Sequence, residues 1–350
     1  MKDLERISGK TERMTLQNDV VPPSSQTDSR PAATAQFVTI TEEEAGQRID
    51  NYLLRVCKGV PKSHIYRILR SGEVRVNKGR IDQLYRLATG DLVRIPPIRI
   101  AEKAAGSAPV PGAEFHIVHE DNHLLVIDKP AGVAVHGGSG VSYGVIEQLR
   151  AARPEAKFLE LVHRLDRETS GLLLLAKKRS ALTNLHEQMR DGKTDKRYLT
   201  LAVGDWKNPR QHVKLPLHKY TTPDGERRVV VQAGGQESHT VFNLLRKWKE
   251  FALLEAELKT GRTHQIRVHL ASSGFPIAGD EKYGDFALNK QLQKASDTRG
   301  ALRRMFLHAY QITFQHPETG KPMTLKAPLP AECDRFLVSL GQPINDNNKR

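Results

Sequence analysis

The sequence predicts an α+β protein built from two folded units. Short apolar runs bounded by Gly, Asn, Asp or Pro are typical of strands, and they occur together with segments in which apolar residues recur at helical spacing. The 350 residues are enough for two domains. Residues 101–112 contain small residues, Pro and Gly without periodicity, which predicts a linker between a unit at 37–100 and another at 113–338.

The composition indicates a polyanionic partner. Lys and Arg number 54 against 40 Asp and Glu, which makes the formal net charge +14. Nucleic acid is the commonest partner of so basic a chain. An anionic membrane is the alternative, but no basic amphipathic helix in the sequence supports it.

The cysteines and the polar N-terminal stretch predict where in the cell the protein is located. Cys57 and Cys333 show no pairing pattern, as expected of free thiols in a reducing cytoplasm, and they cannot form a Cys-rich zinc site. The N-terminal stretch has no apolar run that suits a signal peptide or a membrane span, so we expect a cytoplasmic protein. The polar ends at 1–36 and 339–350 predict disordered tails.

The first unit is expected to contain two helices and several short strands. Apolar residues recur at helical spacing over 49–56 and 65–69, and Pro61 and Gly72 suit the start and the end of the second helix. The remaining segments predict a strand, a hairpin with its turn at 77–79, and a last strand, at 37–40, 73–81 and 92–95 respectively.

Positive side chains are concentrated in the second helix and the hairpin of this unit. They are Lys62, Arg67, Arg70, Arg75, Lys78 and Arg80. If they share one surface, they form a patch that binds phosphates. A merely solvated face is the alternative.

The second unit mixes strands and helices. Strands are predicted at 115–119, 124–128, 172–176, 196–203, 241–245 and 251–258, and the segments 304–309 and 312–314 are expected to close the sheet. Helices are predicted at 143–149, at 180–190 and after a cap at Thr263, ending before Gly274. An excursion over 204–237 contains a hairpin at 223–225.

Asp166 is the candidate catalytic residue. It lies between Arg164 and Arg167, just before the apolar strand 172–176, so we expect it in a loop that leads into the sheet. Two neighbouring guanidinium groups favour the ionised carboxylate. A structural Asp–Arg ion pair is the alternative explanation of this pattern.

No motif indicates a metal or a nucleotide cofactor. His264 and His269 are five residues apart, which places them on different faces of a helix and does not fit the i, i+4 zinc pair. The segment 129–138 contains three glycines, but it has neither a dinucleotide fingerprint nor a phosphate-binding loop.

The segment His-Arg-Leu-Asp-Arg-Glu-Thr-Ser-Gly at 163–171 resembles the signature of the pseudouridine synthases that modify ribosomal and transfer RNA. The segment Gly-Arg-Thr-His-Gln-Ile-Arg-Val-His at 261–269 resembles a further motif of that family, and 129–132 and 276–286 resemble other blocks. The resemblance implies a catalytic domain with a mixed, mainly antiparallel sheet. It also implies a reaction without a cofactor, because nothing is oxidised or added.

The resemblance also implies roles for single residues. Asp166 would be the catalytic carboxylate and Arg267 would pair with it. Tyr198 would stack on the target base and could take its C5 proton, and Arg164 would fill the gap left by the flipped nucleotide. Without the resemblance, Tyr198 would be a packing residue, Arg267 a surface charge and Arg164 a phosphate contact.

The first unit resembles the small RNA-binding module named after ribosomal protein S4, which holds structured RNA with its second helix and hairpin. Together these resemblances predict a synthase that isomerises uridines in large-subunit ribosomal RNA, acting as a monomer without an obligate protein partner. Asp166 could attack C1′ of the ribose or remove a sugar proton. A sibling synthase for other uridines and a non-catalytic assembly factor are the alternatives, whereas a metal-dependent nuclease lacks a carboxylate or histidine cluster.

Overall fold

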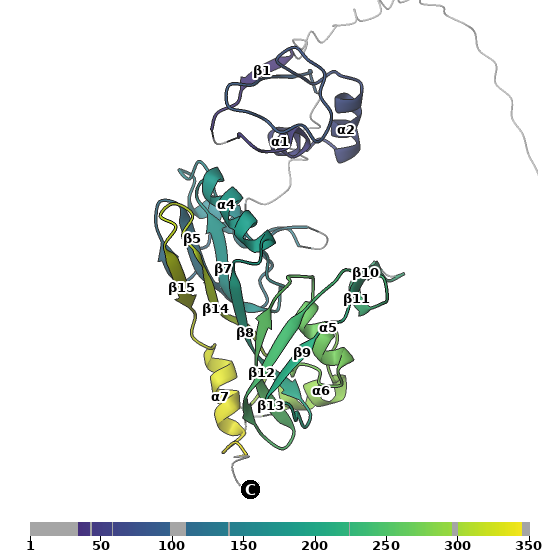
Figure 1. Cartoon of the computed structure of the whole chain (residues 1–350), viewed down its shortest axis with the longest axis vertical. Coiled ribbons are helices and arrows are strands. Elements are labelled where there is room, and N and C mark those ends of the chain that lie inside the picture. The colour runs from purple at the N-terminus through teal and green to yellow at the C-terminus, as the bar shows by residue number, and fades with distance from the viewer. Residues whose placement is uncertain are drawn as a thin grey trace, which may run out of the picture.

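The computed structural model describes residues 34–42, 44–57, 59–98, 110–138, 141–223, 225–295 and 300–344. Each of the two expected units has its own sheet and its own hydrophobic core (Figure 1). Residues 1–33 of the predicted N-terminal tail, most of the linker and residues 345–350 lie outside the described residues, so their disorder stays a prediction. The prediction is wrong at its inner ends, because Gln36 begins β1 and the Ile344 N–H donates to the Lys247 carbonyl (2.7 Å).

The N-terminal unit packs two helices against a three-stranded antiparallel sheet in the order β1-β3-β2. Its elements are β1 (Gln36–Thr39), α1 (Ile49–Val56), α2 (Lys62–Arg70), β2 (Arg75–Val76) and β3 (Leu92–Ile95). Pro61 precedes the first turn of α2 and Gly72 follows its end with a φ of +73°, as the sequence predicted.

The predicted hairpin at 73–81 is only partly formed. The turn is present, with positive φ at Asn77 and Lys78, but β2 pairs with β3, and only Gly79 bridges back to Val76. The Asn77 amide donates to the Asp91 carboxylate (2.7 Å) and its oxygen accepts the Leu92 N–H (2.9 Å). These two bonds attach the turn to the start of β3, which explains why β3 is the partner of β2.

The second unit is organised around a ten-stranded mixed sheet in the described residues. The order β4-β5-β7-β14-β8-β13-β12-β9 is antiparallel except at β7–β14, and β6 and β15 pair with β7 and β14. Its strands are β4 (Ile117–Glu120), β5 (Leu124–Lys129), β6 (Glu160–Leu161), β7 (Ser170–Ala176), β8 (Asp195–Val203), β9 (Arg210–Val213), β12 (Thr240–Lys247), β13 (Phe251–Leu258), β14 (Leu307–Gln315) and β15 (Pro322–Lys326).

Both faces of the sheet are buried at β7, where successive side chains point to opposite faces and enter different cores. On β7, Leu173 and Leu175 join the larger core, whereas Leu172 and Leu174 join a second core under α4. A strand buried on both faces is apolar throughout, which is why the run 172–176 could be assigned from the sequence.

Five helices are described in this unit, and α4 lies on the opposite face of the sheet from α3, α5 and α7. They are α3 (Val145–Ala152), α4 (Arg179–Arg190), α5 (Gln265–Ser272), α6 (Phe286–Lys294) and α7 (Ala331–Ser339). None of the described helices is long and apolar enough to cross a membrane.

Two expectations for this unit are wrong. The segment expected to close the sheet is β14, which lies in the middle between β7 and β8. The residue that caps α5 is His264, in the left-handed region with a φ of +53°, and not Thr263. Neither the order of strands in a sheet nor a left-handed cap at a residue other than Gly can be read from local patterning.

The excursion at 204–237 contains the predicted hairpin. Its strands β10 (Leu217–Thr221) and β11 (Arg227–Val231) form a separate two-stranded sheet in register over five residue pairs. In Figure 1 this hairpin projects from the main sheet beside α5.

Candidate active site

Asp166 lies in the loop between β6 and β7, as its sequence context predicted. The Thr169 N–H donates to the Asp166 carbonyl (3.1 Å), so the loop closes into a tight turn before β7 begins. Gly171, in the second position of β7, has a φ of +111°, and a Cβ there would lie 2.3 Å from the Ala309 carbonyl oxygen. Only glycine therefore allows β14 to approach the strand that holds this loop.

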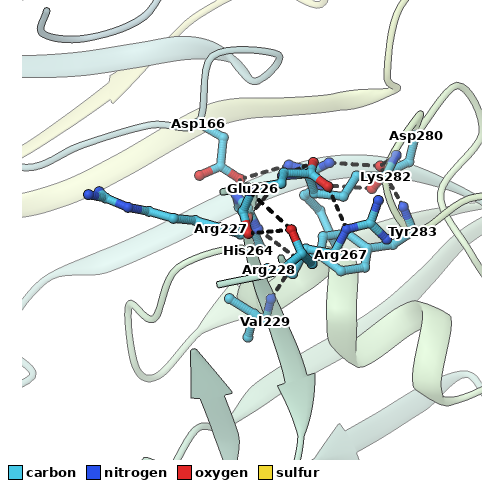
Figure 2. Close-up of polar contacts among 11 residues, drawn as sticks. Asp166, Glu226, Arg227, Arg228, Val229, His264, Arg267, Asp280, Lys282 and Tyr283 are labelled. Carbon is cyan, nitrogen blue, oxygen red and sulfur yellow. Dashed lines mark hydrogen bonds and ion pairs between the residues drawn. The ribbon is translucent and has the colours of Figure 1, made fainter. Parts of the chain in front are cut away.

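Arg267 contacts the Asp166 carboxylate from α5. Its Nη1 donates to Asp166 Oδ2 over 3.3 Å. The two shorter bonds of the same guanidinium go to Asp280, with Nε and Nη2 each 2.7 Å from a carboxylate oxygen. Arg267 is thus fixed by a bidentate pair with Asp280, and its remaining edge faces Asp166 (Figure 2).

The Arg267–Asp280 pair is buried and ionised. Burial alone would raise the pKa of Asp280, but the hydrogen bonds and the charge of Arg267 hold it below its usual range. Burial would likewise lower the pKa of Arg267, and the hydrogen bonds and charge of Asp280, followed by the charge of Asp166, raise it instead. A permanently charged guanidinium therefore faces the Asp166 carboxylate.

Tyr198 lies on β8 and lines the same cavity as Asp166. Burial, and then the negative charge of Asp166, raise the pKa of its phenol, so Tyr198 stays protonated at neutral pH. A phenol with a raised pKa can pack against a ring and donate a hydrogen bond. The stacking on the target base and the uptake of its C5 proton stay predictions for Tyr198.

Two cavities meet at Asp166. The first has a volume of about 390 Å³ and extends toward Tyr198 and Lys196. The second has a volume of about 470 Å³ and extends toward Glu226 and Arg304. Both volumes lie within the range of ligand pockets. The walls common to both are Arg164, Leu165, Asp166, His264 and Arg267.

Arg164 is exposed at the junction of these cavities. Its guanidinium can therefore reach either a phosphate or the face of a base, and the geometry leaves both predicted roles open.

Lys129 is hydrogen-bonded to the loop that contains Asp166. It is fully buried, and its ammonium donates to the carbonyls of Pro130, Val133 and Arg167 at 2.8, 2.8 and 3.1 Å. Burial lowers the pKa of Lys129 to about 7, while three carbonyl acceptors favour the ammonium form. Lys129 thus ties the segment after β5 to the loop that contains Asp166.

The basic residues predicted in the first unit are all exposed. The end of α2 and the turn at 77–79 lie together, because Arg80 donates to the Ser71 carbonyl (2.6 Å) and Arg75 to the Lys78 carbonyl (3.4 Å). The residues gathered around the C-terminal end of α2 are therefore Arg67, Arg70, Arg75, Lys78 and Arg80. Lys62 lies at the other end of the helix, about 12 Å away along its axis.

Three neighbours of Asp166 could not be assigned from the sequence. Asp280 and Tyr283 belong to the block 276–286, which resembles the family without implying a role for either residue. His264 suggests only a metal ligand in the sequence, yet its Nε2 lies 3.8 Å from Asp166 Oδ2. The signal for all three is their place inside conspicuous motifs. Their contacts depend on the tertiary fold.

One group of described residues has the composition of a metal site, namely Asp121, His123 and His316. Asp121 Oδ2 already faces His316 Nε2 at 2.9 Å, and His316 Nδ1 accepts the backbone N–H groups of Glu318 and Thr319. These contacts require the hydrogen on Nε2, and a protonated ring nitrogen cannot ligate a metal. The group is therefore a hydrogen-bonded junction between two turns.

Comparison with known proteins agrees with this geometry. A family model described as RNA pseudouridylate synthase matches residues 123–272, and a model of the S4 domain matches residues 47–93. Proteins named ribosomal large subunit pseudouridine synthase C are similar over most of the chain. The one from Pasteurella multocida is 51% identical over 317 residues, which cover 89% of this chain and 96% of the relative. The chain belongs to the RNA pseudouridylate synthase family.

Other members of the pseudouridine synthase family show the same likeness. The enzyme C of Escherichia coli K12 is 51% identical, with 88% of this chain and 97% of the relative covered. The solved structure of human RNA pseudouridylate synthase domain containing 4 is 27% identical, covers 64% of this chain and 92% of its own, and has a TM-score of 0.53. The predicted family, the resemblance to its enzyme C, and the α+β fold preceded by an S4 module are thus confirmed.

Proposed function

We propose that this pseudouridine synthase isomerises specific uridines of large-subunit ribosomal RNA and that Asp166 is its catalytic carboxylate. The observation that carries the proposal is the place of Asp166, which is hydrogen-bonded to Arg267 at the junction of two cavities and shares one of them with Tyr198. The names of relatives that match nearly their whole length support ribosomal RNA as the substrate.

The isomerisation breaks the N1–C1′ bond of uridine, turns the base and joins C5 to C1′. C5 loses one proton and N1 gains one, so no cofactor is needed. In our assignment the Asp166 carboxylate acts on the ribose, either on C1′ as a nucleophile or on a sugar proton as a base. Arg267 orients that carboxylate. Tyr198 packs on the uracil, and it is our candidate acceptor of the C5 proton.

A stacked uridine has to leave its helix before it reaches Asp166, which costs a few kcal/mol. We assign Arg164 to the space that the base leaves, because its planar guanidinium is exposed at the entrance of both cavities and can stack on neighbouring bases. Loss of a phosphate contact at Arg164 would weaken binding, whereas loss of the insertion would slow the reaction of RNA that is already bound.

The N-terminal unit at 37–100 supplies RNA affinity in this proposal. Its exposed side chains around the end of α2 form a positive surface suited to phosphates. The unit at 113–338 carries the reaction. We propose that the protein acts in the cytoplasm as a monomer without an obligate protein partner.

The decisive experiment uses large-subunit ribosomal RNA transcribed with tritium at C5 of uridine. Purified wild-type protein should release tritium without added metal or cofactor, and the Asp166→Asn variant should release none while its affinity for the RNA changes little. Asp334→Asn, an exposed aspartate of α7 that lines neither cavity, is the matched control.

The outcomes separate the alternatives. Mapping pseudouridine in the product identifies the modified positions, and release from transfer RNA alone would indicate a sibling synthase. An active Asp166→Asn variant would contradict the catalytic assignment. If wild type binds these RNAs and their assembly intermediates without release, the protein is a non-catalytic assembly factor.

A further inference from the structure

The hairpin β10–β11 is fastened beside the catalytic carboxylate by the loop that follows Asp280. Lys282 donates to the Arg227 carbonyl (3.0 Å) and forms an ion pair with Glu226 (2.7 Å). The Val229 N–H donates to the Tyr283 phenol oxygen (3.0 Å). A small sheet that shares no strand with the main one is thus joined to the active site by residues 282 and 283 (Figure 2).

Tyr283 is the point where the hairpin meets the site. Its ring lies under the Arg267 guanidinium, 5.1 Å from the ring centroid. Its hydroxyl contacts both Val229 N and His264 Nδ1, the latter at 2.8 Å. The first contact is made by a backbone N–H, which can only donate, so the phenol oxygen accepts there. The phenol hydrogen is then free to point at His264.

His264 continues the chain of contacts to Asp166. Because Nδ1 accepts the phenol hydrogen, the neutral ring carries its own hydrogen on Nε2, which faces Asp166 Oδ2 at 3.8 Å. Burial lowers the pKa of His264 to about 4, although the charge of Asp166 opposes the shift, so the ring is neutral at physiological pH. The two hydrogen bonds, from Val229 to Tyr283 and from Tyr283 to His264, run in the same direction, and the Nε2–H then faces the carboxylate across 3.8 Å.

The left-handed backbone at His264 indicates that the surrounding structure fixes the position of its imidazole. Among the described residues, only three other than Gly have a positive φ, and His264 is the one that lines the cavities. An L residue in the left-handed region is strained by about 1–2 kcal/mol. Such strain persists where the surroundings over-determine it, and here it aims the imidazole between Tyr283 and Asp166.

We propose that Tyr283 and His264 are positioning residues that join the β10–β11 hairpin to the Asp166 carboxylate. The inference depends on the proposed function, because it gives these residues a part in that reaction. Val229 orients Tyr283, Tyr283 selects the tautomer of His264, and the Nε2–H dipole faces Asp166 and favours one orientation of its carboxylate beside Arg267. The ring of Tyr283 also keeps Arg267 in place.

The two amide substitutions of His264 separate positioning from stability. In His264→Gln the side-chain amide can reach the place of Nε2 and present an N–H to Asp166. In His264→Asn the amide reaches only the place of Nδ1, so Asp166 has no donor there. Asn is the better residue in the left-handed region. A purely structural role therefore predicts that Asn is the better replacement, and the positioning role predicts Gln.

The experiment measures single-turnover tritium release from the labelled RNA, RNA affinity by filter retention and thermal unfolding for each variant. We expect His264→Asn to lower the rate about 10-fold to 100-fold at unchanged affinity, and His264→Gln to retain most of it. Tyr283→Phe keeps the ring and should lose about 10-fold. The double variant His264→Asn, Tyr283→Phe should be no slower than His264→Asn alone, because both break one chain of contacts.

The control is Tyr310→Phe, which removes a phenol that donates to Glu255 and lines neither cavity. The proposal is overturned if His264→Asn or Tyr283→Phe reacts at the wild-type rate, if Asn exceeds Gln, or if the two losses multiply. Wild-type release that depends on Asp166 would in that case leave the proposed function standing. Wild type without release would overturn the function and this inference together.

Discussion

At the scale of single residues, the site depends on one guanidinium that serves two carboxylates. Arg267 gives its two short bonds to Asp280 and its one longer bond to Asp166. This division suits a catalytic carboxylate, since Asp166 is oriented by a fixed charge without being locked in a bidentate pair. Asp280, which is almost completely inaccessible to solvent, compensates the buried charge of Arg267.

Replacing Asp280 by Asn should test this division of labour. The amide cannot balance the buried charge of Arg267, so we expect a loss of about 3 kcal/mol in unfolding free energy, read from urea midpoints. Arg267 should then pair more closely with Asp166, and the rate of tritium release should fall. The exposed control Asp334→Asn should change neither, and a stable, active Asp280→Asn variant would show that Asp280 is dispensable.

The role of Asp166 in the reaction can be decided with deuterium at C2′ of the target uridine. Removal of the C2′ proton by the carboxylate predicts a primary isotope effect on single-turnover release, because that bond breaks. Attack on C1′ predicts an effect close to unity. Deuterium at C5′ is the matched control, since neither route breaks a bond there.

At the scale of elements, the active loop depends on how closely β7 and β14 approach. These are the parallel neighbours in an otherwise antiparallel sheet, and Gly171 faces Ala309 at their point of contact. The sequence shows a Gly after Thr-Ser but not the strand that needs it, because β14 is more than 130 residues away in the chain.

Gly171→Ala should therefore destabilise the protein more than a positive φ alone explains. Its Cβ would lie 2.3 Å from a backbone oxygen that cannot move without opening the sheet, so we expect about 3 kcal/mol or more. Gly192→Ala is the control, because Gly192 also has a positive φ but nothing lies within 4 Å of the added Cβ. That variant should lose only about 1 kcal/mol in the same urea titration.

At the scale of the whole molecule, a reactive unit is linked to a basic unit that supplies affinity. A tether raises the effective concentration of the second unit once the first has bound RNA. The positive surface at the end of α2 then determines how long the complex lasts, and the cavities at Asp166 determine what happens to the flipped base.

Neutralising part of that surface should change salt dependence more than chemistry. For the triple variant Arg67→Gln, Arg70→Gln, Lys78→Gln we expect weaker binding. The slope of log K against log salt should fall by about 0.7 to 0.9 for each phosphate that the variant no longer neutralises. Single-turnover release at saturating protein should stay near wild type. An unchanged slope would mean that RNA is held elsewhere.

The stability of the catalytic unit should fall in mild acid. Burial lowers the pKa values of His163, His264 and His308 to about 3, 4 and 4. Below about pH 6.5 these histidines bind protons in the unfolded chain but stay neutral in the folded protein. The free energy of unfolding therefore decreases as the pH falls from about 6.5 toward 4. Each such proton contributes about 1.4 kcal/mol per pH unit, measurable from urea midpoints at pH 7, 6 and 5.

The sequence alone determined the fold class, the division into two units and most strands and helices, because burial on one or both faces leaves a periodic or continuous apolar pattern. Through motif resemblance it also determined the family and placed Asp166, Tyr198 and Arg267 together. Asp166 and Arg267 are recognisable because they lie inside the long motifs at 163–171 and 261–269, whereas Tyr198 is assigned only through the resemblance to the family.

Only the tertiary structure decided the strand order, the partners of Arg267 and the chain from Val229 through Tyr283 and His264 to Asp166. These contacts join segments that are distant in sequence. They require the contacting groups to lie within 4 Å of one another and His264 to have a left-handed backbone. Local patterning records which side chains are buried and not which side chains meet, so this part of the site became visible only once the chain was folded.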